Sequence, residues 1–208
     1  MNVWDELIQK VDTFHRVKRL YQPIDHPHFK DWELTQICSD RLQTILDYLG
    51  DVSGKRILDI GFFYGYFSHG LARRGATVVG VEISPKKVEI ADLLTECYGL
   101  SARAPEFIHC PYQEYLKGKD QFDVILFMSS WHHDVRNDAK SALEGMNLIS
   151  KHTDILFIDM DERVVKENLR SQLSKEWSPR AILDYTDFTK CEPLKESHIH
   201  RRMLYAYR

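Results

Sequence analysis

Two adjacent histidines, His132 and His133, lie in the segment SSWHHD, directly after the apolar run FDVILFM. A histidine there can remove a proton from a bound hydroxyl group, because the pKa of imidazole is near neutrality. If the segment begins a helix or a turn, the two rings diverge and one of them faces a site. We predict His133 as the base, with His132 as the second choice. The alternative is that both only position the loop or contact a cofactor.

Two carboxylates accompany the histidines, Asp59 in the apolar run ILDI and Glu82 at the end of VVGVE. Between them lies the segment GFFYGYF, which begins at Gly61 and has Phe63 where a dinucleotide loop needs its middle glycine. A bulky ring there opposes a pyrophosphate, and no GxxxxGK[ST] loop is present to bind a triphosphate. Glu82 can still accept hydrogen bonds from ribose hydroxyls. The pattern favours a nucleoside ligand without phosphates.

Short apolar runs that alternate with helical stretches must position these residues. Such alternation predicts a parallel sheet with helices on both faces. The predicted strands are 56–60, 77–82, 106–109, 122–128 and 154–159, and the helices between them are 66–74, 85–98, 112–116 and 138–150. The tail contains two further runs, DFTKCEPLKE and HIHRRMLYAYR, which are too close together for a helical crossover and therefore predict an antiparallel pair at one edge.

The segment before the sheet has a different character. Apolar spacing predicts a helix over the first twenty residues and another over 34–49, with an aromatic loop at 21–32 between them. We predict a single domain of residues 1–208, in which 1–52 form a helical N-terminal extension and possible lid and 53–208 form the core. Tyr21, Gln22 and Trp131 are the predicted acceptor contacts.

Composition limits the partners. The 208 residues carry a net charge of -3, so a nucleic-acid partner is not expected. No apolar run is long enough for a membrane helix, and acidic residues occupy the place where a signal peptide is basic, so we predict a cytoplasmic protein without a membrane contact. The four cysteines are widely spaced, and the histidine pairs 26/28, 132/133 and 198/200 fit no zinc pattern, so no metal site is predicted.

Three motifs in chain order carry a family resemblance. ILDIGFFYGYFS, VVGVEISP and FDVILFM resemble successive motifs of the class I S-adenosylmethionine-dependent methyltransferases, and the closing strand pair resembles the reversed last strand of that fold. The resemblance covers roughly residues 53–208. It implies an α/β Rossmann-like three-layer sandwich, with a seven-stranded, mostly parallel sheet and an antiparallel last strand. It also implies S-adenosyl-L-methionine as cofactor.

The resemblance assigns roles by position. The first motif of the family commonly reads LDIGCGTGYFS, which Asp59, Gly61 and Gly65 match. By that match Asp59 and Gly61 approach the methionyl part, Glu82 binds the ribose and Ile83 lies along the adenine. The residues expected to bind cofactor are Asp59, Gly61, Phe62, Phe63, Gly65, Glu82, Ile83, Pro111, Tyr112 and Ser129.

We therefore predict a methyltransferase that transfers a methyl group from S-adenosylmethionine to a small-molecule acceptor. Oxygen is preferred over nitrogen as the methylated atom, because a hydroxyl acceptor benefits from a histidine base. The alternatives are an RNA or protein methyltransferase, a non-catalytic S-adenosylmethionine-binding protein of the same fold, and a nicotinamide oxidoreductase. No oligomeric state is predicted.

Overall fold

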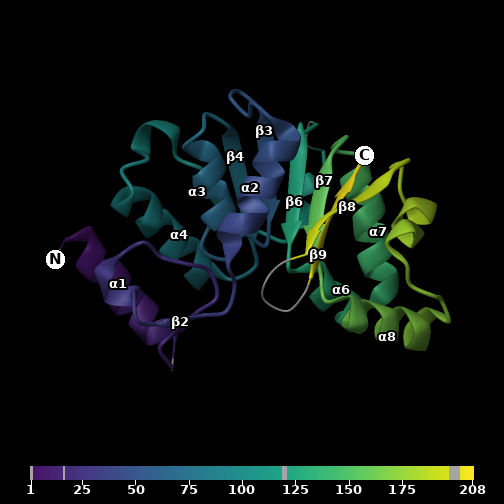
Figure 1. The fold of residues 1–208 in the computed structure, drawn as a ribbon, viewed down its shortest axis with the longest axis horizontal. Coiled ribbons are helices and arrows are strands. Elements are labelled where there is room, and N and C mark those ends of the chain that lie inside the picture. The colour runs from purple at the N-terminus through teal and green to yellow at the C-terminus, as the bar shows by residue number, and fades with distance from the viewer. Residues whose placement is uncertain (1, 16, 119–120, 197–201) are drawn as a thin grey trace.

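The computed structural model describes residues 2–15, 17–118, 121–196 and 202–208. Its centre is a seven-stranded sheet with the strand order β5-β4-β3-β6-β7-β9-β8 (Figure 1). The strands are β3 (Arg56–Ile60), β4 (Thr77–Glu82), β5 (Glu106–His109), β6 (Val124–Met128), β7 (Leu156–Asp159), β8 (Cys191–Glu196) and β9 (Met203–Tyr207). Strands β3 to β7 pair in parallel, and β9 lies antiparallel between β7 and β8. The predicted fold class is confirmed.

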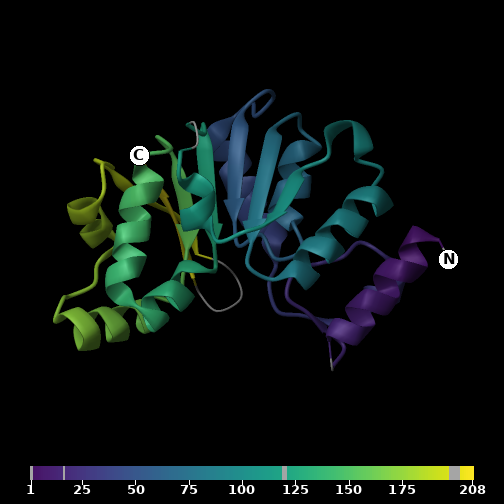
Figure 2. The ribbon, with the colours of Figure 1, turned by 180° about the vertical axis from the view of Figure 1, so that it is seen from behind.

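Helices cover both faces of the sheet. Helices α2 (Cys38–Leu49) and α3 (Tyr66–Ala72) lie on one face, and α4 (Pro85–Cys97) packs beside them against β4 and β5. Figure 2 shows the opposite face from behind, where α7 covers the strands. The helical elements that share this side are α5 (Tyr112–Leu116), α6 (Trp131–Asn137), α7 (Ala139–Ser150), α8 (Glu162–Leu173) and the 3-10 helix η3 (Pro179–Tyr185). A second 3-10 turn, η2 (Ser101–Arg103), precedes β5.

The central strands β6 and β7 form where the sequence is apolar on both faces. All five residues of β6 are buried, as are all four of β7, because helices cover the sheet on both sides. The predicted helices at 66–74, 85–98, 112–116 and 138–150 are present with small shifts of their ends. Helix α8 is not among the predicted helices, although Val165 and Leu169 give it a buried face at a spacing of four residues.

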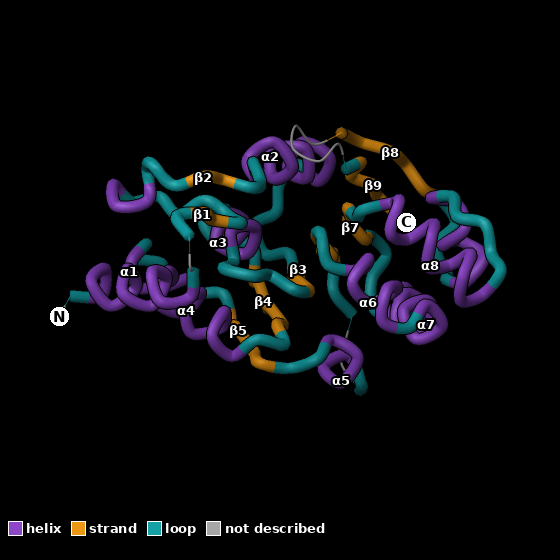
Figure 3. The backbone as a smooth tube through the Cα atoms, turned by 90° about the horizontal axis from the view of Figure 1, so that it is seen from below, coloured by secondary structure: helices purple, strands orange, loops and turns teal. Residues whose placement is uncertain are grey.

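The N-terminal extension packs against α4. It comprises α1 (Val3–Phe14), β1 (Arg19–Leu20), the 3-10 turn η1 (Pro27–Phe29) and β2 (Glu33–Leu34). The two residues of β1 pair in parallel with the two residues of β2. Asn2 and Asp5 form a capping box that starts α1, and Leu7 and Val11 pack in one cluster with Ile90 and Leu94 of α4. Figure 3 shows α1 alongside α4. The first helix is shorter than predicted, and α2 begins four residues after the predicted start.

The strand order reverses between β3 and β6. From β3 the chain continues to β4 and β5 on one side and then returns to β6 and β7 on the other. In an open parallel sheet, a crevice forms beyond the carboxyl ends of the strands at such a reversal. Within the described residues, no helix combines the length and the apolar composition that crossing a bilayer requires.

Candidate functional site

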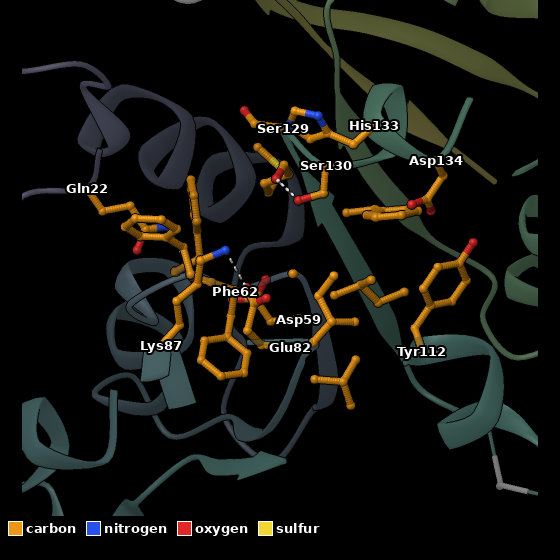
Figure 4. A pocket seen from close by; sticks show the side chains of 18 of the residues that line it. Gln22, Asp59, Phe62, Glu82, Lys87, Tyr112, Ser129, Ser130, His133 and Asp134 are labelled. Atoms are coloured by element: carbon orange, nitrogen blue, oxygen red, sulfur yellow. Dashed lines mark hydrogen bonds and ion pairs between the residues drawn. The ribbon is translucent and has the colours of Figure 1, made fainter. Parts of the chain in front are cut away.

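A cavity of about 560 Å³ opens at the strand reversal. It lies at the carboxyl ends of β3, β4 and β6, and the extension closes part of it with Tyr21 and Gln22. Figure 4 shows that Asp59 and Glu82 lie on one side of the cavity, with Ser129, Ser130 and His133 across from them. Clefts of this size commonly hold a cofactor-sized ligand.

The GFFYGYF segment turns from β3 into α3 through two glycines in the left-handed region. Gly61 has φ 67, and a Cβ atom there would lie 2.6 Å from Oγ of Ser130. Gly65 has φ 79, and its Cβ would lie 2.7 Å from the ring of Phe107. Both positions therefore require glycine. Gly61 borders the cavity, whereas Gly65, a predicted cofactor contact, does not line it.

Gln22 holds this loop from the extension. Its Nε2 donates to the Phe62 carbonyl at 3.1 Å, and its Oε1 accepts from the backbone N–H groups of Tyr64 and Tyr66 at 3.1 and 3.2 Å. The side chain is 4% exposed. Gln22 was predicted as an acceptor contact. It lines the cavity, but its amide is occupied by the loop.

The two phenylalanines of the loop have different surroundings. Phe62 is buried and packs on Phe107 with ring centroids 4.4 Å apart. Phe63 has φ 60, and its ring lies 4.9 Å from that of Tyr21 and 4.8 Å from Nζ of Lys87. Phe62 therefore supports the loop against the sheet, while Phe63 joins the extension to the cavity rim.

The carboxylates of Asp59 and Glu82 both line the cavity. Oδ2 of Asp59 accepts a hydrogen bond from Oγ of Ser68 at 2.6 Å, and burial raises the pKa of Asp59 to about 7. Glu82 is 4% exposed, accepts from the backbone N–H of Ser84 and pairs with Lys87 at 3.3 Å. One Glu82 oxygen thus contacts a backbone donor and the other a cation.

The next part of the cavity wall follows β4 and β5. Ile83 lies on the rim and is 72% exposed, and Tyr112 at the start of α5 is buried. In Figure 4 the Tyr112 hydroxyl points toward Asp134 of α6. Burial raises the pKa of both groups, that of Asp134 to about 6. Pro111, a predicted cofactor contact, does not line the cavity.

Helix α6 directs its first residues to different sides. His132 and His133 line the cavity, with ring centroids 4.2 Å apart. Desolvation lowers the pKa of His132 to about 3 and also lowers the pKa of His133, with a further contribution from the positive charges of Arg136 and Arg202. Both imidazoles are therefore neutral at pH 7 and able to accept a proton.

Trp131, a predicted acceptor contact, is fully buried and does not line the cavity. Its Nε1 donates to the Ala142 carbonyl at 3.2 Å, and its ring packs near Trp177. Successive helix residues point about 100° apart. Because Trp131 faces α7, the next two residues, His132 and His133, face the cavity. This residue is part of the helical core.

A buried ion pair at the cavity floor was not predicted. Arg41 of α2 donates through Nη1 to Oδ2 of Asp159 at 2.7 Å, and both side chains are at most 1% exposed. Asp159 also accepts from the N–H and Oγ of Ser129, which has φ 54. These bonds hold Ser129 in a backbone region that non-glycine residues rarely adopt. The sequence signal for this ion pair is an arginine, Arg41, on the apolar face of α2 between Cys38 and Ile45, where a charged side chain needs a buried partner.

Arg202, which directly precedes β9, also lines the cavity and was not predicted. Across the residues that the structure describes, no group of three His, Cys, Asp or Glu side chains is arranged to hold a metal ion. His198 and His200 lie outside those residues.

Comparison with known proteins gives three related findings. A family model described as a methyltransferase domain matches residues 57–153. The O-antigen chain terminator bifunctional methyltransferase/kinase WbdD of Escherichia coli is 26% identical over 197 residues, which are 86% of this chain and 26% of WbdD. The ubiquinone biosynthesis O-methyltransferase of Actinobacillus pleuropneumoniae is 24% identical over 183 residues, 77% of this chain and 76% of that protein.

Solved structures share the fold. A crystal structure of WbdD superposes with a TM-score of 0.75 at 22% identity and covers 97% of this chain and 46% of that one. The magnesium protoporphyrin IX methyltransferase of Synechocystis PCC 6803 with bound S-adenosylmethionine gives a TM-score of 0.57 at 16% identity, and covers 81% of this chain and 77% of that one. The chain thus spans only part of WbdD, about a quarter in the sequence match.

Proposed function

Since the chain carries a methyltransferase domain of the class I S-adenosylmethionine-dependent type, we propose that it methylates an oxygen atom of a small-molecule acceptor. S-adenosylmethionine is the cofactor of this domain, and it supplies an electrophilic methyl group on a sulfonium. The single observation that carries the proposal is a cavity that has the Glu82 carboxylate at one end and two neutral histidines at the other.

The cavity residues fit an adenosine without phosphates. Glu82, at the end of β4, offers carboxylate oxygens to ribose hydroxyls. Exposed Ile83 and buried Tyr112 provide apolar surface beside it for the adenine ring. The Phe63 ring occupies the place where a pyrophosphate would need a glycine, which is compatible with a methionine tail. Asp59 and Gly61 border the space left for that tail.

His133 is the proposed base. In-line methyl transfer depends chiefly on placement, and a hydroxyl acceptor gains nucleophilicity when its proton is removed. His133 is exposed to the cavity and its imidazole is neutral near pH 7, whereas His132 is buried and its pKa of about 3 makes it a weak base. His132 then supports the ring of His133 through the contact between their tilted rings.

We also propose that residues 1–52 form a cover over the cavity. Tyr21 and Gln22 line it, and Tyr21 contacts Phe63. A cover of this kind excludes water from the transfer and restricts the acceptor to a small molecule. The name of the ubiquinone biosynthesis O-methyltransferase relative is consistent with an oxygen of a small molecule as acceptor.

The first experiment is calorimetry with S-adenosylmethionine and S-adenosylhomocysteine on the purified protein and on Glu82→Ala. We expect binding that Glu82→Ala weakens by roughly 30-fold or more, since it removes charge-assisted hydrogen bonds to the ribose. Glu106→Ala, at an exposed glutamate of β5, is the matched control and should leave affinity unchanged. Absence of binding in the unaltered protein would refute the cofactor assignment.

The second experiment identifies the acceptor. The protein is incubated with methyl-labelled cofactor and a metabolite extract, and the labelled product is identified by mass spectrometry. A labelled small molecule with a new methyl ether or ester supports the proposal. Label in RNA or protein alone, or on nitrogen, contradicts it.

A further inference from the structure

Three cationic side chains line the cavity, and two of them have a carboxylate partner. Arg41 pairs with Asp159 at 2.7 Å, and Lys87 pairs with Glu82 at 3.3 Å. Arg202 differs from both. Its Nε and Nη1 atoms are inaccessible to solvent, and neither has a hydrogen-bond partner in the described part of the chain.

An unpaired guanidinium in such a place is unfavourable. A charge that is removed from water without a partner loses solvation that nothing replaces, so buried cations are normally paired. Arginine cannot relieve this loss by releasing its proton, because its guanidinium remains charged at any physiological pH. Arg202 lines the cavity as a half-buried residue, so its charge lies in the cavity wall with two N–H donors that no protein group among the described residues satisfies.

Arg202 lies on the side of the cavity away from Glu82. It immediately precedes β9, and Leu204 of β9 is in register with Asp159 of β7. Four strand spacings separate β9 from β4 in the sheet order, which is roughly 19 Å at 4.8 Å per spacing. Arg202 and both histidines line the same cavity, and the charge of Arg202 contributes to the lowered pKa of both histidines.

We propose that the acceptor carries an oxyanion, a carboxylate or a phosphate, that pairs with Arg202 next to the oxygen that is methylated. This inference rests on the proposed function, because it assigns the acceptor to the histidine side of the cavity. Guanidinium donors form strong charge-assisted hydrogen bonds with both kinds of oxyanion. The competing occupant is the carboxylate of the cofactor's own methionine.

The test measures anion binding to protein saturated with S-adenosylhomocysteine. Benzoate and phenyl phosphate are the two anionic probes, and benzyl alcohol is the neutral probe of similar size. We expect one of the anions to bind at least about tenfold more tightly than the alcohol, as one charge-assisted contact provides. The stronger of the two anions identifies the carboxylate or the phosphate as the recognised group.

Arg202→Gln should abolish that preference while it changes the affinity for S-adenosylhomocysteine less than twofold. Arg202→Lys keeps the charge and should retain part of the preference. Arg103→Gln, at an exposed arginine in η2, is the matched control and should behave like the unaltered protein. If the anions and the alcohol bind equally, or if Arg202→Gln weakens S-adenosylhomocysteine as much as it weakens the anion, the inference is overturned. Failure of S-adenosylhomocysteine to bind at all refutes the proposed function instead.

Discussion

Replacing Gln22 by leucine should weaken cofactor binding although Gln22 offers the cofactor no free polar atom. The change keeps a side chain of similar size and removes three hydrogen bonds to the backbone of residues 62–66. The N–H groups of Tyr64 and Tyr66 then lose the side-chain oxygen that accepts from them, and the Phe62 carbonyl keeps only the bond from the Gly65 N–H at 2.9 Å. The loop must open to water to satisfy them, and binding must then restore its shape.

The size of the effect follows from the bonds that are lost. Each contributes about 1 kcal/mol net, so the three together amount to roughly 3 kcal/mol. If that energy is needed to reorder the loop on binding, the dissociation constant for S-adenosylhomocysteine rises about 100-fold. If the altered loop remains ordered, the same energy appears as a lower free energy of unfolding.

Calorimetry and urea denaturation measure these two quantities on the same variants. Gln22→Glu gives a sharper comparison, because one carboxylate oxygen can still accept from Tyr64 and Tyr66 while the other meets the Phe62 carbonyl. Its cofactor affinity should therefore improve as the pH is lowered toward 5, where a protonated carboxyl can donate to that carbonyl. Gln43→Leu, which removes an exposed glutamine bonded to Asp47, is the control. If Gln22→Leu changes the affinity by less than twofold and the free energy of unfolding by less than about 0.5 kcal/mol, Gln22 does not hold the loop for the cofactor.

Two further predictions concern ionisation. His133→Gln should lower kcat by roughly 100-fold and leave cofactor affinity unchanged. Because the pKa of His133 is lowered from 6.5, the acid limb of the kcat/KM profile of the unaltered protein should lie below pH 6.5. An acid limb above pH 7 would contradict the role of His133 as the base. Asp59 has a folded-state pKa raised to about 7 from 3.8, so the native state retains a proton that the unfolded state has lost, and stability should decrease as the pH rises from about 4 to 7. Asp59→Asn should flatten that decrease in urea denaturation at pH 5 and pH 8, and equal slopes in both proteins would exclude Asp59 as its cause.

The sheet and its cavity follow from local patterns in the sequence. Five apolar runs with helical stretches between them specify parallel strands, and the ends of those strands bring Asp59 and Glu82 to one edge. The paired histidines after β6 also reach the cavity, as their position after a strand predicts. These features depend only on residues that are neighbours in the sequence, so a single sequence is enough to predict them.

Contacts between distant polar groups could not be read in the same way. Gln22 meets a loop about forty positions away, and Arg41 meets Asp159 across 118 positions. Their partners depend on where α2 and the extension pack, which no local pattern specifies. Trp131 shows the same limit at short range, because the rotation of α6 decides which of its first residues face the core.

In a chimeric protein with a different N-terminal segment, the GFFYGYF loop would lose the hydrogen bonds of Gln22. The N-terminal extension, which places Tyr21 in the cavity wall, is the segment that a chimera would exchange to change the proposed acceptor. That segment also supplies one donor to the Phe62 carbonyl and the acceptor for two loop N–H groups, all through Gln22. A new N-terminal segment therefore has to bring its own glutamine or a redesigned loop with it, so under the proposed function a change of acceptor would also change cofactor affinity.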